Sequence, residues 1–402
     1  MDVEKIRQDF PILKSGVVYF DNAASSLTPE PVLQKEAEFY HEYRANIHRG
    51  AHRLTRKASE EYEAARHKLA KFFNVRQGKD GMFVNVSNTT HGINLVALGL
   101  EWKKGDEVLT SSIEHHSNLL PWQRLERKVG VKMNVYEASL DGEFDVSAFC
   151  EKINSNTKLV AITAASNVLG TAPDVEKIAK IAKEKGCLVL VDGAQAVGHR
   201  LVDLSKIRAD YYAFSGHKSL GPTGTGALFV RNGAPLEAAI LGGGTVKTAE
   251  FHSETPADGA ERFEAGTPNI AGFIGLGAAI EYLSGIGVEN IRRHEVELSK
   301  EMIKRFEELE ESSKNKIKLF GPRDPGVKGA VFPFVVEGID AHQVAVMCDE
   351  LQKVCVRSGE HCAGPLHRLL GVPATVRASL HVYNTPAEMD KFFNALETVS
   401  KL

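Results

Sequence analysis

Residues 187–195 read Cys187-Leu188-Val189-Leu190-Val191-Asp192-Gly193-Ala194-Gln195. An uninterrupted apolar run of this kind is typical of a strand buried on both faces, as in a parallel sheet covered by helices. The run ends in a carboxylate, and in open α/β sheets ligands bind beyond the carboxyl ends of the strands. The stretch therefore predicts an α/β sheet with a polar site at one edge.

Similar runs alternate with amphipathic helical segments between about residue 60 and residue 235. The predicted strands are Met82–Val86, Glu107–Thr110, Lys132–Tyr136, Leu159–Ala164, Cys187–Asp192, Tyr211–Ser215 and Ala227–Arg231. The predicted helices between them include Thr90–Gly99 and Val175–Lys185. This order favours a large domain of the α/β class with a mostly parallel, seven-stranded sheet.

The pattern changes near residue 284, where a long charged helix leads into an α+β segment. The predicted elements there are helices 288–312, 341–351 and 386–399 and strands 331–336 and 354–357. We expect a large domain over residues 21–284 and a smaller α+β domain over residues 1–20 and 285–402. The Gly-rich stretch Gly242–Gly266 is expected to be loop.

Composition excludes several classes of protein. A formal charge of -3 shows none of the excess of basic residues that is typical of nucleic-acid-binding proteins. No apolar run approaches the roughly 18 residues of a membrane span, and the N-terminus lacks a secretory pattern. The five cysteines include no CxxC pair, which argues against a disulfide framework and a structural zinc site and favours the cytoplasm.

Two strand ends carry chemically suggestive groups. Asp192 is either a helix N-cap or a partner that keeps a pyridinium nitrogen protonated, so that the ring accepts electrons. Lys218 closes the turn Ser215-Gly216-His217-Lys218 after a predicted strand. A loop lysine is usually a solvated charge, but a small-residue turn at a sheet edge lets an amine approach an aldehyde carbon closely.

Two more strand ends fit the same pocket. Ser87-Asn88-Thr89-Thr90 opens a helix, where hydroxyls and free N–H groups either cap the helix or bind a phosphate. Glu114-His115-His116-Ser117-Asn118 follows another strand. An imidazole there could bind a metal, but no second ligand cluster accompanies it, and stacking on a cofactor ring fits better.

The chain resembles the fold-type I pyridoxal-phosphate enzymes of the class V aminotransferase superfamily, and within them the group II cysteine desulfurases, which overlap in sequence with selenocysteine lyases. The resemblance rests on motifs in the family's order between residues 20 and 385. They are Phe20-Asp21-Asn22-Ala23-Ala24-Ser25, Asn46-Ile47-His48-Arg49-Gly50, Glu114-His115-His116-Ser117-Asn118, Ser166-Asn167-Val168-Leu169-Gly170, Asp192-Gly193-Ala194-Gln195, Ser215-Gly216-His217-Lys218, Phe263-Glu264-Ala265-Gly266-Thr267-Pro268-Asn269, Arg357-Ser358-Gly359-Glu360-His361-Cys362 and Arg377-Ala378-Ser379-Leu380.

The resemblance implies pyridoxal 5'-phosphate as cofactor, bound as a Schiff base by Lys218. It implies that Asp192 pairs with the ring nitrogen, that Gln195 donates to the phenolic oxygen and that His115 stacks on the ring. The phosphate would be held by Thr89, Thr90, Ser215, His217 and a neighbouring subunit's Thr267. Asn167, Arg357 and Arg377 would bind substrate, and a guanidinium suits a carboxylate in any case.

One position departs from the family, which usually has Gly before its Thr pair, where this chain has Asn88. Asn tolerates left-handed backbone angles better than most residues, so the turn is expected to survive.

Cys362 lies in a segment rich in turn residues, whereas the other four cysteines lie in apolar surroundings. A buried, inert thiol is the default for those four. Arg357, His361 and His367 are expected to favour the thiolate form of Cys362, and a mobile loop would let it reach a substrate. Cys362 is therefore the candidate nucleophile beside Lys218 and His115.

The resemblance implies a cysteine desulfurase, which converts L-cysteine to L-alanine and leaves a persulfide on Cys362 for a protein acceptor or an iron–sulfur scaffold. A selenocysteine lyase acting on L-selenocysteine, another class V aminotransferase or epimerase, and a catalytically silent scaffold remain alternatives. A homodimer is expected, because the family uses the Thr267 segment to reach a neighbour's cofactor.

Overall fold

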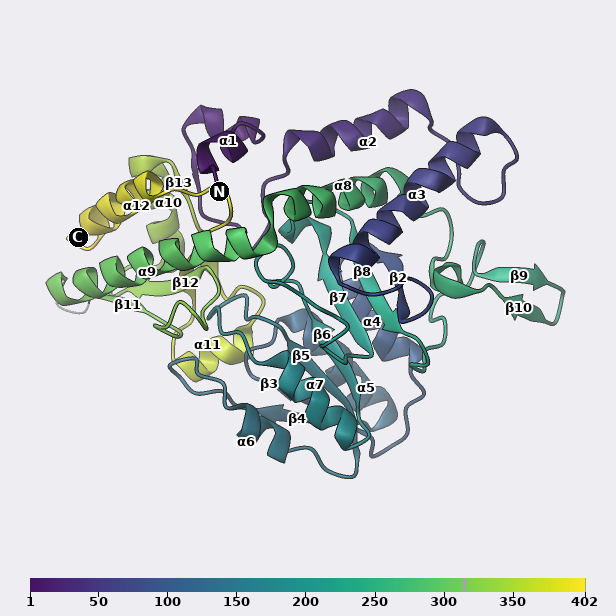
Figure 1. Cartoon of the computed structure of the whole chain (residues 1–402). Helices are drawn as coiled ribbons and strands as arrows, with labels where there is room; N and C mark the ends of the chain where they lie inside the picture. The colour runs from purple at the N-terminus through teal and green to yellow at the C-terminus, as the bar shows by residue number, and fades with distance from the viewer. Residues whose placement is uncertain (314–315, 402) are drawn as a thin grey trace.

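The computed structural model describes residues 1–313 and 316–401, and its centre is a seven-stranded sheet in the order β2-β8-β7-β6-β5-β3-β4 (Figure 1). The strands are β2 (Gly81–Val86), β3 (Glu107–Ser111), β4 (Lys132–Tyr136), β5 (Thr157–Thr163), β6 (Leu188–Asp192), β7 (Tyr211–Ser215) and β8 (Gly226–Arg231). Only β8 runs against its neighbours. The predicted α/β class and the mostly parallel sheet are confirmed.

Helices cover both faces of this sheet. They are α2 (Glu30–Glu42), α3 (Arg53–Phe72), α4 (Thr89–Gly99), α5 (Leu120–Val129), α6 (Val146–Glu151), α7 (Val175–Glu184) and α8 (Ile270–Ile286). Val189 and Val191 of β6 belong to one buried cluster with α3, α7 and α8, whereas Leu190 belongs to a second cluster with α4 and α5. Successive side chains of a strand point to opposite faces, so both faces demand apolar residues.

A second, four-stranded antiparallel sheet has the order β11-β12-β15-β14. Its strands are β11 (Ile317–Leu319), β12 (Val331–Val336), β14 (Arg357–Gly359) and β15 (Thr375–Ser379). The helices in this part are α1 (Val3–Arg7), α9 (Val288–Ser312), α10 (Ala341–Gln352), α11 (Gly364–Leu370) and α12 (Pro386–Val399). Val18 and Phe20 pack into the core of this part, whereas Phe10 packs into the larger core. The division at residues 20 and 284 stays a proposal.

Two predicted elements differ from the structure. The strand predicted at 354–357 is two strands, because β13 (Val354–Cys355) pairs with β1 (Val18–Tyr19) while β14 joins the four-stranded sheet. The loop predicted at Gly242–Gly266 contains a hairpin of β9 (Val246–Ala249) and β10 (Glu254–Pro256), which projects from the body (Figure 1). Most of the hairpin is exposed, so no apolar alternation marks it in the sequence.

Among the described residues, no single helix has the length and apolar composition to cross a membrane. Only α8 and α9 taken together meet that composition, across a bend of 71°. Most of α8 is buried in the large core.

Candidate active site

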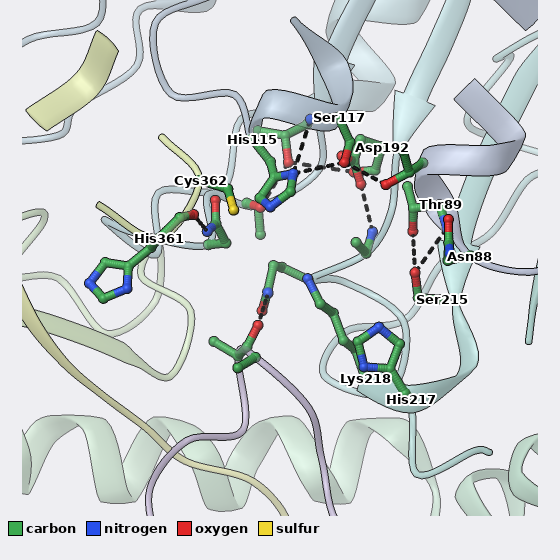
Figure 2. A pocket seen from close by; sticks show the side chains of 18 of the residues that line it. Asn88, Thr89, His115, Ser117, Asp192, Ser215, His217, Lys218, His361 and Cys362 are labelled. Carbon is green, nitrogen blue, oxygen red and sulfur yellow. Dashed lines mark hydrogen bonds between the residues drawn. The ribbon is translucent and has the colours of Figure 1, made fainter. Parts of the chain in front are cut away.

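The polar strand ends meet in one cavity of about 350 Å³ between the two sheets. Loops after β2, β3, β5, β6 and β7 supply one wall, and the segments of β14 and β15 supply the other. Figure 2 shows His115, Asp192, Lys218 and Cys362 in this cavity. Of the predicted site residues, only Thr267 lies outside its lining.

Lys218 ends a 3₁₀ turn, Gly216–Lys218, that follows β7. Gly216 is required there, because a Cβ would lie 2.3 Å from the Thr225 hydroxyl. The Lys218 amine faces the cavity, yet the surrounding protein keeps it from bulk water, and this desolvation lowers its pKa to about 8. The Asp192 carboxylate acts in the opposite direction, and the Arg377 guanidinium lowers the pKa further. About one tenth of the amine is therefore neutral at pH 7, far more than for an ordinary lysine.

Asp192 is buried at the end of β6, and its Oδ1 accepts a 2.9 Å hydrogen bond from the Ala194 N–H. Burial raises the pKa of Asp192, and Lys218 partly offsets the shift. The carboxylate thus caps the following turn and also faces the cavity, so the two alternatives for this residue are compatible. Gln195 donates to the Ala23 carbonyl oxygen at 2.7 Å.

His115 is held by Ser117, whose N–H donates to Nδ1 at 3.1 Å. Because Nδ1 accepts, the neutral ring carries its proton on Nε2. Burial, and then the Lys218 charge, lower the pKa of His115 to about 3. A neutral, fixed ring of this kind can stack on an aromatic cofactor.

Glu114, which the sequence interpretation left without a role, is fully buried behind His115. Its carboxylate accepts from Ser111, Asn118 and the Thr163 N–H at 2.6–3.0 Å. Burial raises the pKa of Glu114 to about 8, and Asp192 adds to the shift. Glu114 directly precedes His115 and His116, which is the one sign in the sequence that it belongs to the site. The burial of its side chain cannot be predicted from that position.

The start of α4 gathers hydroxyl groups at one end of the cavity. The Thr89 N–H donates to Ser215 Oγ at 2.9 Å, and Thr90 Oγ1 lies 2.6 Å from Ser117 Oγ. Desolvation lowers the pKa of His217 to about 4, so its ring is neutral at physiological pH. Hydroxyls at a helix N-terminus suit a phosphate.

The account given above for Asn88 is wrong. Its backbone is extended, with φ −179°, and no left-handed turn is formed. The side chain instead caps α4 by accepting from the His91 N–H at 2.9 Å.

Arg377 is buried, and its Nη1 donates to the Asn167 carbonyl oxygen at 2.9 Å. Among the described residues, its Nε and the Asn167 Oδ1 have no hydrogen-bond partner. Desolvation lowers the pKa of Arg377 to about 10, which leaves it cationic at neutral pH. Asp21 lies 3.5 Å from Arg377 and 2.7 Å from Arg357, so this carboxylate, overlooked in the sequence, orients both guanidinium groups.

Cys362 is exposed, whereas Cys150, Cys187 and Cys348 are buried and Cys355 is partly buried. The expectation that His361 and His367 supply positive charge beside it is wrong. Desolvation lowers the pKa of His361 to about 2 and also lowers that of His367, so both rings are neutral.

Thr267 lies in a second cavity of about 290 Å³ with residues 46–49 and the glycines before the hairpin. Its Oγ1 accepts from Asn46 Nδ2 at 3.4 Å. Both residues belong to motifs quoted for the family, and within one chain they lie in this second cavity and not in the cavity of Lys218.

Within the described residues, one potential metal-ligand group occurs, formed by His199, Glu295 and His381 outside the main cavity. His199 Nδ1 lies 2.7 Å from Glu295. Arg200 and Arg292 line a small cavity together with His199 and Glu295. The Glu295 carboxylate therefore already has cationic neighbours. A site without metal stays the prediction.

The cavity suits a phosphorylated aldehyde that carries a basic ring nitrogen. A lysine whose pKa is lowered to about 8 faces a buried carboxylate, a helix N-terminus lies beside them, and the volume falls within the range of small-ligand sites. These features define a pyridoxal-phosphate enzyme of fold type I, and pyridoxal 5'-phosphate is its cofactor. The chain belongs to the class-V aminotransferase family, whose profile matches residues 18–392.

Full-length relatives agree with this assignment. The chain is 44% identical to a probable cysteine desulfurase of Pyrococcus abyssi, covering 99% of this chain and 98% of the relative. It is 42% identical to the apo structure of a cysteine desulfurase from Thermococcus onnurineus, with a TM-score of 0.93 and coverage of 99% and 98%. A cysteine desulfurase of Escherichia coli is 31% identical, with a TM-score of 0.88 and coverage of 100% and 99%. The resemblance stated from the motifs is confirmed.

Proposed function

We propose that this enzyme is a cysteine desulfurase, which converts L-cysteine to L-alanine and retains the sulfur as a persulfide on Cys362. The observation that carries the proposal is that Cys362 is the exposed thiol of the five and lines the same cavity as Lys218. A transaminase or an epimerase needs no such thiol.

The bound cofactor supplies an electron sink for the α-carbon of the substrate. Lys218 holds the cofactor in the resting enzyme and moves the α-proton, a task suited to an amine with a pKa of about 8. Asp192 would keep the ring nitrogen of the cofactor protonated, and His115 would stack on the ring. Thr89, Thr90, Ser215 and His217 would hold the phosphate, and Gln195 would donate to the phenolic oxygen.

Arg377 and Asn167 bind the substrate carboxylate, with Arg357 at the mouth of the cavity. The Arg377 Nε is buried and has no partner among the described residues, so a carboxylate would satisfy it. Asp21 keeps Arg357 in place through the 2.7 Å ion pair. This arrangement favours an α-amino acid over an amine that lacks the carboxylate.

Cys362 attacks the substrate sulfur as a thiolate. The sulfur–sulfur bond forms while the carbon–sulfur bond of the substrate breaks, and its electron pair stays with the carbon. The proton released by the Cys362 thiol ends on the methyl group of alanine, which balances the reaction. Lys218 and Arg377, rather than the loop histidines, supply the positive charge near the sulfur.

Two further features belong to the proposal. A homodimer would let Thr267 and its cavity complete the phosphate site of a second copy, since Thr267 does not line its own chain's cavity. The five thiols are unpaired, which suits the cytoplasm, where a protein acceptor or an iron–sulfur scaffold would take the sulfur.

Alanine and sulfide formed from L-cysteine, with and without reductant, test the function. Cys362→Ser should keep the cofactor absorbance and lose turnover, while Cys355→Ser, a control at a partly buried thiol, should change neither. After a single turnover without reductant, the peptide containing Cys362 should gain about 32 Da, one sulfur atom. Normal desulfuration by Cys362→Ser would refute the assignment. Activity of Cys362→Ser on L-selenocysteine distinguishes a selenocysteine lyase from a cysteine desulfurase, because the lyase reaction depends less on Cys362.

A further inference from the structure

His116, the second histidine of the pair after β3, makes hydrogen bonds to Cys362 and to Gly364, two residues further on. Its backbone N–H donates to the Cys362 carbonyl oxygen at 2.7 Å. Its Nε2 accepts from the Gly364 N–H at 3.1 Å. His116 itself does not line the cavity, whereas His115 does.

The segment that His116 touches is strained. His361 and Cys362 have φ values of 50° and 55°, in the left-handed region that non-glycine residues seldom adopt. Such a backbone persists only where its surroundings determine it. Besides His116, Asn167 Nδ2 holds the His361 carbonyl oxygen at 2.8 Å.

These contacts join the two parts of the molecule. His116 follows β3 of the large sheet, and Cys362 lies between β14 and α11 beside the small sheet. The neighbouring His115 ring faces the cavity, and the centroids of the two rings lie 6.3 Å apart. One dipeptide therefore contacts both the predicted cofactor position and the nucleophile segment.

We propose that His116 is a positioning residue for Cys362: by accepting the Gly364 N–H, it keeps the strained segment closed and the thiol directed at the substrate sulfur. The proposal rests on the proposed function and names a residue that acts through the nucleophile. It requires Nε2 to be unprotonated, so the neutral ring carries its proton on Nδ1. The hydrogen bond to Cys362 is donated by the backbone N–H, which the Phe, Gln and Asn variants keep, so these variants test the imidazole alone.

Three variants separate this role from general packing. His116→Phe keeps a ring but has no acceptor, His116→Gln places a carbonyl near the Nε2 position, and His116→Asn is too short to reach Gly364. His294→Phe is the matched control, because it removes one side-chain hydrogen bond to a backbone carbonyl, at 2.9 Å, and His294 does not line the cavity.

The measurements are kcat and KM for alanine formation, the rate of Cys362 alkylation by iodoacetamide, and the cofactor absorbance. His116→Phe and His116→Asn should lower kcat by roughly 10–100-fold, the scale expected when a reacting group is displaced by about 1 Å. KM and the absorbance should stay within about twofold of the wild-type values, since binding does not involve the thiol. Alkylation should become faster in both variants, and His116→Gln should restore most of kcat.

Equal activity of the Gln and Asn variants, or wild-type kcat and alkylation in His116→Phe, would overturn the positioning role. Loss of the cofactor absorbance together with kcat would also overturn it, because a structural defect would then explain the loss. If His116→Phe does not fold, the comparison of Gln with Asn decides. The proposed function fails separately, through normal turnover by Cys362→Ser.

Discussion

The protonation of Lys218 gives a prediction about how the cofactor-free protein takes up pyridoxal phosphate. Only the neutral amine attacks an aldehyde, so the rate of covalent binding follows the neutral fraction of Lys218. With its pKa lowered from 10.5 to about 8, roughly one tenth of Lys218 is neutral at pH 7. An unperturbed lysine would be neutral in about one molecule in 3,000 at that pH. Burial is therefore expected to raise the neutral fraction of this lysine at pH 7 by roughly 300-fold over that of an ordinary lysine.

Stopped-flow absorbance of the cofactor-free protein mixed with pyridoxal phosphate between pH 6 and 10 measures this rate. We expect a tenfold rise per pH unit below about pH 7.5 and a plateau above about pH 9. Asp192→Asn should move the midpoint to lower pH, because the Asp192 carboxylate raises the pKa of Lys218. Lys206→Ala, which removes an exposed lysine, is the control and should change nothing. A rate that keeps rising up to pH 10 would refute the lowered pKa.

Four further outcomes are expected. Lys218→Ala should lack the Schiff-base absorbance, and borohydride reduction onto another lysine would show that the anchor is misplaced. Asp192→Ala should keep that absorbance and lose turnover by at least about 100-fold, since the ring becomes a poor electron sink; turnover near that of the wild type would contradict its role. Sedimentation should find a dimer, and a fully active monomer would exclude a shared site at Thr267. Burial lowers the pKa of Lys328 to about 7, so its contribution to stability is present above about pH 10.4 and lost as the pH falls through about 7. The difference in thermal midpoint between the wild type and Lys328→Met should therefore rise as the pH is raised from about 7 to about 10.4. Midpoints of the two proteins that change in parallel with pH would contradict this expectation.

The strands of the large sheet and most of the site residues can be predicted from the sequence, because both depend on local patterns. The apolar run before Asp192 and the small-residue turn around Lys218 are contiguous, and parallel strands bring their carboxyl ends to one edge. The hairpin at 246–256 was missed for the opposite reason. It lies outside both cores, so burial imposes no alternation on it.

Contacts between distant segments could not be predicted. Asp21 meets Arg357 and Arg377 only because the chain after β1 lies beside β15, which brings residues more than 300 positions apart into contact. Similarly, nothing in the spacing of His116 and Cys362 indicates that they touch. The motif resemblance placed these residues in one family pattern without giving their mutual geometry.

The predicted positive charge of His361 and His367 is wrong because both rings are desolvated, and this bears on how Cys362 is activated. His361 and His367 were counted as cations because they are close in sequence, but a buried imidazole without a carboxylate partner loses its proton. Arg357 shares its charge with Asp21 at 2.7 Å. Arg377 remains cationic, and Lys218 is mostly protonated at pH 7, so positive charge reaches the thiol from the cofactor side of the cavity. The same lysine is the amine proposed to move the α-proton, so the thiol and the proton-transfer group line one cavity.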